Sequence, residues 1–404
     1  MCVVGAGPAG LSAAVHAAAR GAEVTIRERN DRCGAKLLTT GGGRCNVTNL
    51  RPAEEWPALF GRRGRFIVPA LSFLDRDALA GWFASLGQSL ACPDGFHLFP
   101  ASNSAKAVRD ALAAEASRLG VKVLFSDRVS SVEWGDGVYV VDGASRTEYD
   151  RLILACGGNS WPATGSTWDG ARMAEALGHR VNPPFPGLVG LRAANLDAEL
   201  AGLVLPDAEV VFAEKGRADT IGQGELLLTH GGISGPAVLD LSASAVQALD
   251  GVGGTVLRLR WLAGRDRNWW LECLAGWRKE KGGASPPVLL KEYIPFRLAR
   301  WLCRHAGVDD AAQAANIPAP VRDRLAEFLG GYPAAITESE GWDKAMITRG
   351  GVDVRDIDPK TLGSRIVPEL YFAGEMIDVD GPCGGYNLHW AFASGALAGV
   401  SACS

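Results

Sequence analysis

Three glycines near the start of the chain have the spacing of a turn that binds a dinucleotide. Gly5, Gly7 and Gly10 follow a short β-branched stretch and open an Ala-rich, helix-forming run. The first glycine permits a tight turn, the second lets the backbone approach a pyrophosphate, and the third lets helix and strand pack closely. Free N–H groups at the start of the helix would then bind the phosphates. A glycine-rich turn that only joins a strand to a helix is the simpler alternative.

A second strand and an acidic residue favour the first of these two interpretations. Residues 22–29 form an expected strand that brings Glu28 to its end, 18 residues past Gly10. A carboxylate there can accept hydrogen bonds from the ribose hydroxyls of adenosine, and an acid argues against a 2′-phosphate. The residues expected to contact the nucleotide are Gly5, Gly7, Pro8, Ala9, Gly10, Glu28 and Arg29.

Two further glycine-rich segments can contact the same ligand. Residues 35–49 read AKLLTTGGGRCNVTN, and the apolar strand at 152–155 runs into two glycines. Backbone amides in such loops can bind a second phosphate or the polar edge of a ring. The contacts expected from these segments are Lys36, Gly43, Arg44, Cys45, Asn46, Ala155 and Gly157.

The C-terminal segment repeats this arrangement of strand, glycine turn and helix. An apolar strand starts at Leu370, the sequence DGPCGGYN follows, and residues 388–399 form an Ala-rich helix whose small side chains permit close packing on the sheet. Acidic side chains here could hold ribitol hydroxyls, and the amides before the helix could face a flavin ring. The expected contacts are Gly374, Glu375, Asp378, Gly384, Gly385 and Asn387.

A ligand that both ends of the chain contact must be long, and FAD in an extended conformation fits this requirement. The dipole of the last helix would stabilise the negative charge of the reduced flavin. The chain has no second strand–GxGxxG–helix unit, so we expect NAD(P)H as a transient reductant rather than a second resident nucleotide. No Cys and His residues have metal-ligand spacing, and we expect no metal site.

Four segments resemble one flavoprotein family: TGGGRCNVTN (40–49), GNSWPATGSTWDG (158–170), ELLLTHGGISGPAVLDLS (225–242) and LYFAGEMIDVDGPCGGYNLHWAFASG (370–395). In this order they are similar to the YhiN/BaiN-type flavoproteins, often labelled the aminoacetone oxidase family of FAD-binding enzymes. The resemblance implies an FAD domain of glutathione-reductase-like topology, interrupted by an inserted β-barrel and a helical subdomain. It implies FAD contacts at Gly5, Gly7, Gly10, Glu28, Arg44, Gly374, Glu375, Gly385 and Asn387.

The pattern along the chain changes after two prolines at 183–184. Short strands are expected at 188–191, 209–213, 225–229 and 255–262, and helical spacing extends from 266 to about 329. We therefore expect an α/β protein with a Rossmann-like FAD-binding domain at 1–187 and 346–404. Its insert would comprise a β-barrel-like domain at 188–262, a helical subdomain at 263–330 and a return through the β part at 331–345.

Composition excludes several classes of protein. The 404 residues are 47% hydrophobic and 21% charged, which is typical of a globular chain, and the net charge of −4 does not mark a nucleic-acid binder. The nine cysteines lack the spacing of a disulfide framework. No run of about 18 apolar residues is present, so we expect no membrane span and a cytoplasmic location.

One segment departs from the overall acidic balance. Residues 258–304 carry eleven basic and four acidic residues, with five of the twelve tryptophans. The tryptophans could fill a small helical core beneath a solvated basic face, which is the favoured interpretation. Alternatively, the basic groups could bind RNA phosphates while an aromatic ring stacks on a base. A small-molecule substrate is therefore expected, and RNA is the alternative partner.

Three side chains in the family-like segments are candidate proton donors. Cys383, His389 and His230 could protonate the carbon next to the one that accepts hydride. Each also has a structural interpretation, as a small loop residue or a hydrogen-bonded histidine. The expected activity is hydride transfer from NAD(P)H through flavin N5 to an activated C=C or similar acceptor. The alternatives are a flavin amine oxidase that uses O₂ and a flavoenzyme that reduces uridine in ribosomal RNA.

Overall fold

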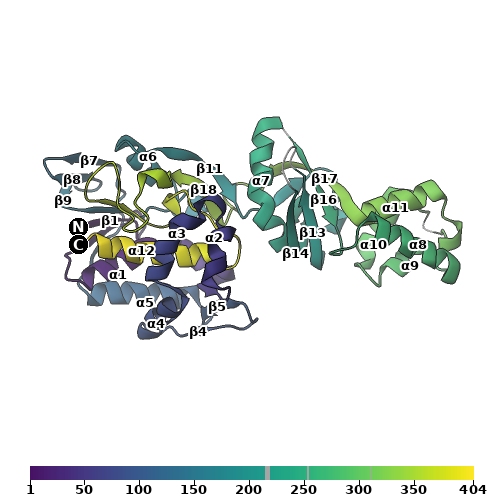
Figure 1. Cartoon of the computed structure of the whole chain (residues 1–404), viewed down its shortest axis with the longest axis horizontal. Coiled ribbons are helices and arrows are strands. Elements are labelled where there is room, and N and C mark those ends of the chain that lie inside the picture. The colour runs from purple at the N-terminus through teal and green to yellow at the C-terminus, as the bar shows by residue number, and fades with distance from the viewer. Residues whose placement is uncertain (214–218, 253, 310) are drawn as a thin grey trace. The chain divides into compact units, whose positions relative to one another are not determined.

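The computed structural model describes residues 1–213, 219–252, 254–309 and 311–404, which form two compact units (Figure 1). One unit joins Met1–Pro186 to Met346–Ser404, and the other comprises Gly187–Ala345. The first unit therefore contains both ends of the chain.

A five-stranded parallel sheet organises the first unit, in the order β19-β10-β1-β2-β6. Val4 lies in register with Arg27 and Leu154, and Leu154 with Phe372, so four strands end at one edge. The turns after these strands therefore meet there, which is where open α/β sheets bind ligands. The strands are β1 (Cys2–Val4), β2 (Thr25–Arg27), β6 (Lys122–Leu124), β10 (Leu152–Leu154) and β19 (Leu370–Phe372).

The first and last long helices of this unit, α1 (Pro8–Ala18) and α12 (Tyr386–Ser401), pack side by side. A Cβ on Gly395 would lie 2.2 Å from the Ala9 carbonyl oxygen, and one on Gly399 would lie 2.2 Å from that of Ala13. The sequence predicted that small residues of the last helix pack on the sheet. Their closest approach is instead to α1, because these two glycines let the helix backbones meet.

The remaining elements of the first unit surround this sheet. Two small antiparallel sheets have the orders β3-β5-β4 and β7-β8-β9, and β11 pairs with β18. The helices are α2 (Trp56–Leu59), α3 (Gly64–Phe73), α4 (Arg76–Ser85), α5 (Ala105–Arg118) and α6 (Asp169–Ala176). The strands are β3 (Thr48–Asn49), β4 (Leu90–Ala91), β5 (His97–Pro100), β7 (Ser131–Gly135), β8 (Val138–Asp142), β9 (Thr147–Tyr149), β11 (Val181–Gly187) and β18 (Ile347–Val352). Short 3₁₀ turns are η1 (Lys36–Gly43), η2 (Ala53–Glu55), η3 (Gly61–Arg63), η4 (Pro162–Thr164), η7 (Val354–Asp356) and η8 (Gly374–Met376).

The second unit contains a closed antiparallel barrel in the order β12-β15-β14-β13-β16-β17. This confirms the predicted Rossmann-like fold with an inserted barrel and helices. The strands are β12 (Leu191–Ala193), β13 (Val204–Phe212), β14 (Thr220–Thr229), β15 (Gly232–Ser234), β16 (Thr255–Arg260) and β17 (Tyr332–Ser339). The helices are α7 (Pro236–Val252), α8 (Arg267–Glu280), α9 (Pro286–Leu290), α10 (Phe296–Ala306) and α11 (Ala319–Gly331), with 3₁₀ turns η5 (Ala198–Leu200) and η6 (Ala314–Asn316).

Two details of the predicted insert were wrong. The strand expected at 188–191 starts only at Leu191, because Leu188 has a left-handed φ of +48° that interrupts extended backbone. The helix α7 was not predicted within the β part. Most of its described side chains are buried and only a narrow face at Pro236, Asp240 and Gln247 is exposed, so the amphipathic pattern that predicts a helix is weak.

The tryptophans of the basic segment form the core of the helical part. Trp261, Trp270, Trp277 and Trp301 are each at most 7% exposed. Trp301 donates a hydrogen bond of 2.6 Å to Asp197, and Arg304 pairs with Glu199. These four rings therefore cannot stack on a base, and one of the basic side chains ties α10 to η5.

Candidate cofactor site

A large pocket opens at the carboxyl edge of the parallel sheet. The space inside it, counted out to the open solvent at its mouth, is about 1300 Å³. Its walls come from the turns after β1, β2 and β10, from η8 and from the start of α12. All of its lining residues belong to the first unit.

The three glycines between β1 and the start of α1 differ in what a side chain at each position would meet. Gly5 has φ +101°, and a Cβ there would lie 2.6 Å from the Ala155 carbonyl oxygen. A Cβ on Gly10 would lie 1.9 Å from the Gly5 oxygen. A Cβ on Gly7 would meet no protein atom within 4 Å, although Gly7 lines the pocket. Protein packing therefore requires Gly5 and Gly10, whereas the open space at Gly7 is available to a ligand.

Glu28 is buried at the end of β2 and its carboxylate organises this side of the pocket. Oε2 accepts a hydrogen bond of 2.7 Å from the Ala6 N–H, and Oε1 accepts 2.8 Å bonds from the backbone and side-chain amides of Asn30. Carboxylate oxygens have about four lone-pair sites, so the Oε2 atom can also accept from a ribose hydroxyl.

A loop between β10 and α6 closes over the same end of the pocket. Arg29 donates to the Gly165 carbonyl at 3.1 Å and to the Thr167 hydroxyl at 2.5 Å, while Asn30 donates to the Thr164 carbonyl at 3.1 Å. Arg29 thus lines the pocket and also holds the loop. Ala155 and Gly157 of this loop were predicted, but Asn30, Thr164, Gly165 and Thr167 were not, because only side chains with an evident role toward the nucleotide were considered.

Lys36 and Glu375 form an ion pair in the wall of the pocket, with 2.6 Å between Nζ and Oε2. Lys36 also donates to the Ser160 hydroxyl at 2.5 Å, and Glu375 Oε1 accepts from that hydroxyl and from the Thr348 N–H. Glu375 was predicted to hold ribitol hydroxyls. Much of its capacity is already used by the protein, and Ser160 and Thr348 were missed because they lie in distant segments.

The start of α12 is held in place by amide side chains. Asn387 lines the pocket, accepts from the Gly381 N–H at 2.8 Å and donates to the Gly381 and Pro382 carbonyls. Asn49 donates to the Gly384 carbonyl at 2.8 Å. The Asn46 amide, oriented to satisfy both neighbours, accepts from Gly385 N–H and donates to the Thr48 carbonyl. The predicted loop 35–49 and the C-terminal glycines therefore lie together.

The structure brings twelve of the twenty predicted cofactor residues into the pocket wall. Those that line it are Gly5, Gly7, Pro8, Ala9, Glu28, Arg29, Lys36, Ala155, Gly157, Gly374, Glu375 and Asn387. Those outside the wall are Gly10, Gly43, Arg44, Cys45, Asn46, Asp378, Gly384 and Gly385.

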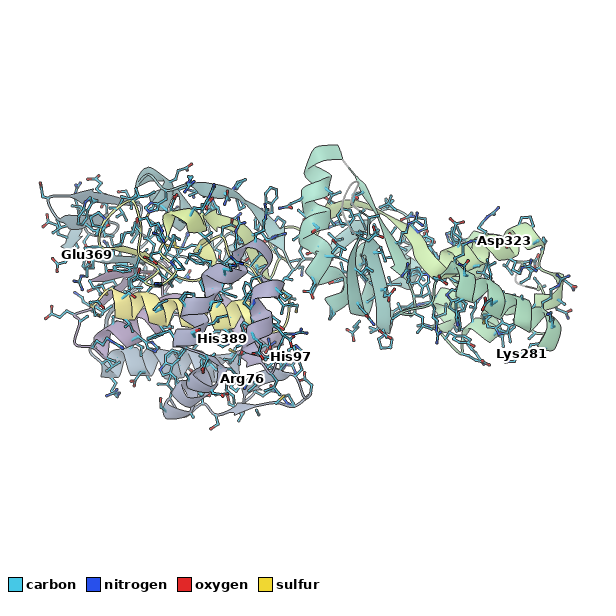
Figure 2. All side chains as sticks on the ribbon, viewed as in Figure 1. Arg76, His97, Lys281, Asp323, Glu369 and His389 are labelled. Carbon is cyan, nitrogen blue, oxygen red and sulfur yellow. The ribbon has the colours of Figure 1, made fainter. Side chains whose placement is uncertain are left out.

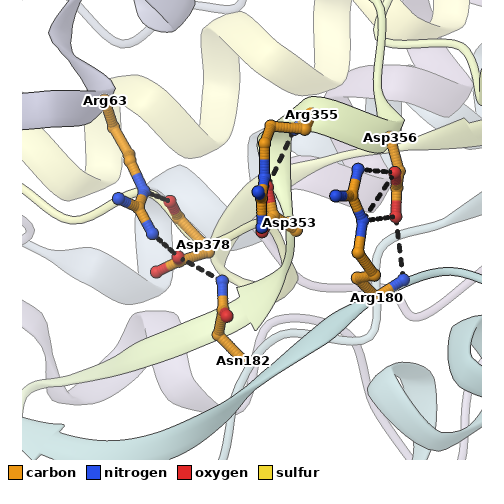
Figure 3. A network of polar contacts seen from close by, with 7 residues as sticks. All are labelled: Arg63, Arg180, Asn182, Asp353, Arg355, Asp356 and Asp378. Carbon is orange, nitrogen blue, oxygen red and sulfur yellow. Dashed lines mark hydrogen bonds and ion pairs between the residues drawn. The ribbon is translucent and has the colours of Figure 1, made fainter.

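Three of the outside residues have other roles. Cys45 is fully buried, which raises the pKa of its thiol to about 12 and keeps it neutral. Arg44 lies over the Phe99 ring, 4.6 Å from its centre. Asp378 pairs with Arg63 and accepts from Asn182, so it anchors β11 rather than facing the pocket (Figure 3).

The three candidate proton donors are not in the pocket wall. His389 is 2% exposed, its Nδ1 and Nε2 each lie 2.8 Å from a partner (Thr48 Oγ1 and the Leu74 carbonyl), and burial lowers its pKa to about 4 (Figure 2). This geometry supports the structural interpretation of His389. His230 follows β14 in the second unit, and Cys383 lies in the turn before α12.

These observations test whether FAD suits the residues present. Gly7 leaves a backbone cradle at the N-terminus of α1, Glu28 is positioned for a ribose, and the 16-residue helix α12 starts at the same pocket. A long cofactor with a pyrophosphate at its middle fits that arrangement. Among the described residues, no group of three His, Cys, Asp or Glu side chains is arranged to hold a metal ion, and no helix is long and apolar enough to cross a membrane.

Comparison with known proteins identifies the family. The HI0933-like protein Rossmann domain matches residues 1–401. The chain belongs to this family. Its members are FAD-dependent oxidoreductases, which confirms the predicted family and enzyme class.

Two relatives and one solved structure illustrate the similarity. The 3-dehydro-bile acid delta(4,6)-reductase of Clostridium scindens is 31% identical, over 99% of this chain and 98% of the relative. The ribosomal RNA dihydrouridine synthase of Haemophilus influenzae is 32% identical, over 99% of this chain and 97% of the relative. The 3-ketosteroid-delta4-(5alpha)-dehydrogenase of Rhodococcus jostii is 17% identical with a TM-score of 0.51, covering 100% of this chain and 96% of that one; it shares the fold.

Proposed function

We propose that this FAD-dependent oxidoreductase reduces a carbon–carbon double bond conjugated to a carbonyl group, with NAD(P)H as the electron donor. One observation carries the cofactor part of the proposal: the first helix and the last helix of the chain start at the same pocket. The lining also includes Glu28 at the end of β2, so the pocket runs along several strand ends and suits an extended molecule such as FAD.

Particular residues would hold the parts of this cofactor. The backbone at Gly7 and the start of α1 would bind the pyrophosphate, and Glu28 would accept hydrogen bonds from the ribose. The positive end of α12, beside Asn387, would stabilise negative charge on the ring. When bound, FAD supplies hydride transfer at N5 and storage of two electrons.

The substrate class follows from what two relatives share. One is named for a delta(4,6) reduction on a 3-dehydro-bile acid and the other for the synthesis of dihydrouridine. In each case the double bond removed is conjugated to a carbonyl, although the molecules differ greatly in size. We therefore assign the reaction class, reduction of an activated C=C, to this chain as well.

Stopped-flow measurement of the two half-reactions tests this proposal. The purified holoprotein is mixed anaerobically with NADH or NADPH, and the reduced protein is then mixed with 2-cyclohexen-1-one or with O₂. We expect one of the nucleotides to bleach the flavin and the enone to restore its colour faster than air does. Rapid reoxidation by O₂ with stoichiometric peroxide, and none by the enone, would instead indicate the amine oxidase.

Reduction of uridine in ribosomal RNA is a second candidate, supported by an aromatic–basic surface on the inserted unit. We define this surface as Arg265, Trp269, Tyr293 and Phe296. Arg265 lies 4.5 Å over the Trp269 ring, Trp269 and Tyr293 are 5.7 Å apart, and Phe296 is 46% exposed. Exposed rings beside cations suit single-stranded nucleic acid.

Binding of a uridine-rich single-stranded RNA tests this second candidate. We expect an affinity that falls steeply with salt concentration and falls about tenfold or more when Tyr293→Ala and Phe296→Ala are combined, because stacking contributes about 1–3 kcal/mol per base. Val288→Ala, which removes an exposed aliphatic side chain of the same unit, is the control. Equal affinity of the double variant and the wild type would contradict RNA binding at this surface.

A further inference from the structure

An Asp–His pair lies on the hairpin that leads into β5. His97 Nδ1 is 2.7 Å from Asp94 Oδ2, and Asp94 Oδ1 accepts hydrogen bonds from the Phe96 and His97 N–H groups at 3.0 and 2.8 Å. Three contacts thus fix one carboxylate against one imidazole. The two side chains are 48% and 34% exposed, and ion pairs in such positions add little to stability.

The free edge of this imidazole faces the turn before α12. A Cβ built on Gly384 would lie 3.5 Å from His97 Nε2, next to the rings of Phe96 and Tyr386. His97 also pairs with Asn49 across β3 and β5, and Asn49 donates to the Gly384 carbonyl. Among the described residues no hydrogen-bond partner meets Nε2. His97 and Gly384 lie outside the pocket wall, and the imidazole is 34% exposed at the turn that leads into α12, whose first residues line the pocket.

The other histidines of the first unit are engaged by the protein. Both nitrogens of His389 have partners, as do both nitrogens of His179, namely the Ala174 carbonyl and the Ser364 hydroxyl. His16 Nδ1–H donates to the Ser12 carbonyl, and its ring packs edge-on against Trp82. Of these four imidazoles, only His97 combines a carboxylate partner on one nitrogen with an accessible second nitrogen.

We propose that His97 is the proton donor to the substrate and that Asp94 is its positioning residue. The inference rests on the proposed function, because it needs an activated C=C bound near the start of α12. In the imidazolium form, in which Nδ1–H is donated to Asp94, the Nε2–H bond would break as a C–H bond forms at the carbon next to the carbonyl. The two electrons for that bond come from the C=C π bond, and FAD, when bound and reduced, would supply the hydride for the second C–H bond. Solvent then returns the proton to Nε2.

Separate half-reactions test this assignment. In His97→Gln we expect unchanged FAD content and unchanged flavin reduction by NAD(P)H, but about 100-fold slower reoxidation by 2-cyclohexen-1-one, since general acids contribute about 10²–10⁴-fold. Asp94→Asn should slow reoxidation to a smaller extent, and Asp94→Glu should restore most of it. His305→Gln, on α10 of the inserted unit, is the matched control and should behave as the wild type.

Chemical labelling gives a readout that does not depend on turnover. In the oxidised wild-type protein, diethyl pyrocarbonate should modify His97 ahead of His389 and His179, because both ring nitrogens of His389 and of His179 are hydrogen-bonded within the protein. 2-Cyclohexen-1-one should protect His97, since it can occupy the site of the oxidised protein without being reduced. Labelling is followed by mass spectrometry of the peptide that contains residue 97, so it remains informative even if a variant fails to fold.

The possible failures are distinguishable. If His97→Gln is reoxidised within threefold of the wild-type rate, or if the enone leaves labelling of His97 unchanged, the assignment of His97 is wrong while the proposed function stands. If the reduced wild type is itself not reoxidised by the enone, the proposed function fails, and the role of His97 fails with it.

Discussion

At the scale of single residues, we expect alanine substitutions of Gly7 and Gly10 to have opposite effects: one weakens FAD binding and the other destabilises the fold. Gly7→Ala places a methyl group in open space, so we expect the apoprotein to keep its thermal midpoint while its affinity for FAD falls at least about tenfold. Gly10→Ala forces a methyl group against the Gly5 carbonyl and should destabilise the apoprotein by about 1–3 kcal/mol. Melting of each apoprotein and FAD titration measure the two effects. If Gly7→Ala destabilises the apoprotein and leaves the FAD affinity unchanged, the assignment of the Gly7 backbone to the pyrophosphate is wrong.

The buried imidazole of His389 should make the stability of the protein depend on pH. Burial lowers its folded pKa to about 4, against about 6.5 in an unfolded chain. Between these values the unfolded state binds the extra proton, so this contribution is complete above about pH 6.5 and is lost as the pH falls toward 4. His389→Gln should reduce the slope of unfolding free energy against pH in this window by up to about 1.4 kcal/mol per pH unit. Urea titrations at pH 4.5 to 7 measure it, and an unchanged slope would contradict the buried neutral imidazole.

At the scale of elements, three arginine–aspartate pairs lie beside β11 and β18, the strands through which the chain passes between the two units (Figure 3). Arg180 pairs with Asp356, Arg355 with Asp353, and Arg63 with Asp378. The hydrogen bond from Arg355 holds the pKa of Asp353 well below its usual range, and that from Arg180 lowers the pKa of Asp356. Both carboxylates are therefore charged and paired at neutral pH.

These pairs predict a loss of stability in acid. Because the folded pKa values are depressed, the contribution is present above the unfolded pKa of about 3.9 and is lost as the pH falls below it. Asp353→Asn should lower stability at pH 7 by about 1 kcal/mol, since Arg355 is largely exposed, and should flatten the decline between pH 5 and 3. Asp136→Asn, on the turn between β7 and β8, is the control. A decline as steep as that of the wild type would contradict this account.

The sequence predicted the elements well where a local pattern determines them. The glycine turn, Glu28 and the last helix depend on spacing within about thirty residues, and each lies where it was expected. The Lys36–Ser160–Glu375 contacts join segments that are 124 and 215 residues apart, and no local pattern encodes such a meeting. For His389 the sequence left both a catalytic and a structural interpretation open, and for Cys45 it predicted a cofactor contact, because burial depends on how the whole chain packs. His97 was missed for the same reason: its carboxylate partner is local, but its position beside Gly384 is not.

At the scale of the whole molecule, the pocket belongs to one of the two units. A ligand that binds only the folded state stabilises it by about 2.7 kcal/mol at 100 times its dissociation constant. We expect FAD added to the apoprotein to slow amide hydrogen exchange in β1, α1 and the start of α12, and to leave the barrel strands β13 and β16 unchanged. Protection confined to the barrel would place the cofactor elsewhere.

The central claim is that a single FAD spans the pocket from the turn at Gly7 to the start of α12. Titration of the apoprotein with FAD and, separately, with FMN tests it most directly, because FMN lacks the AMP half of FAD, which contains the ribose assigned to Glu28 and one of the two phosphates assigned to the Gly7 backbone. We predict one FAD per chain and at least about 100-fold weaker binding of FMN, since hydrogen bonds to charged groups contribute about 1.5–3 kcal/mol each. Equal affinities for FAD and FMN, or no binding of FAD, would contradict it.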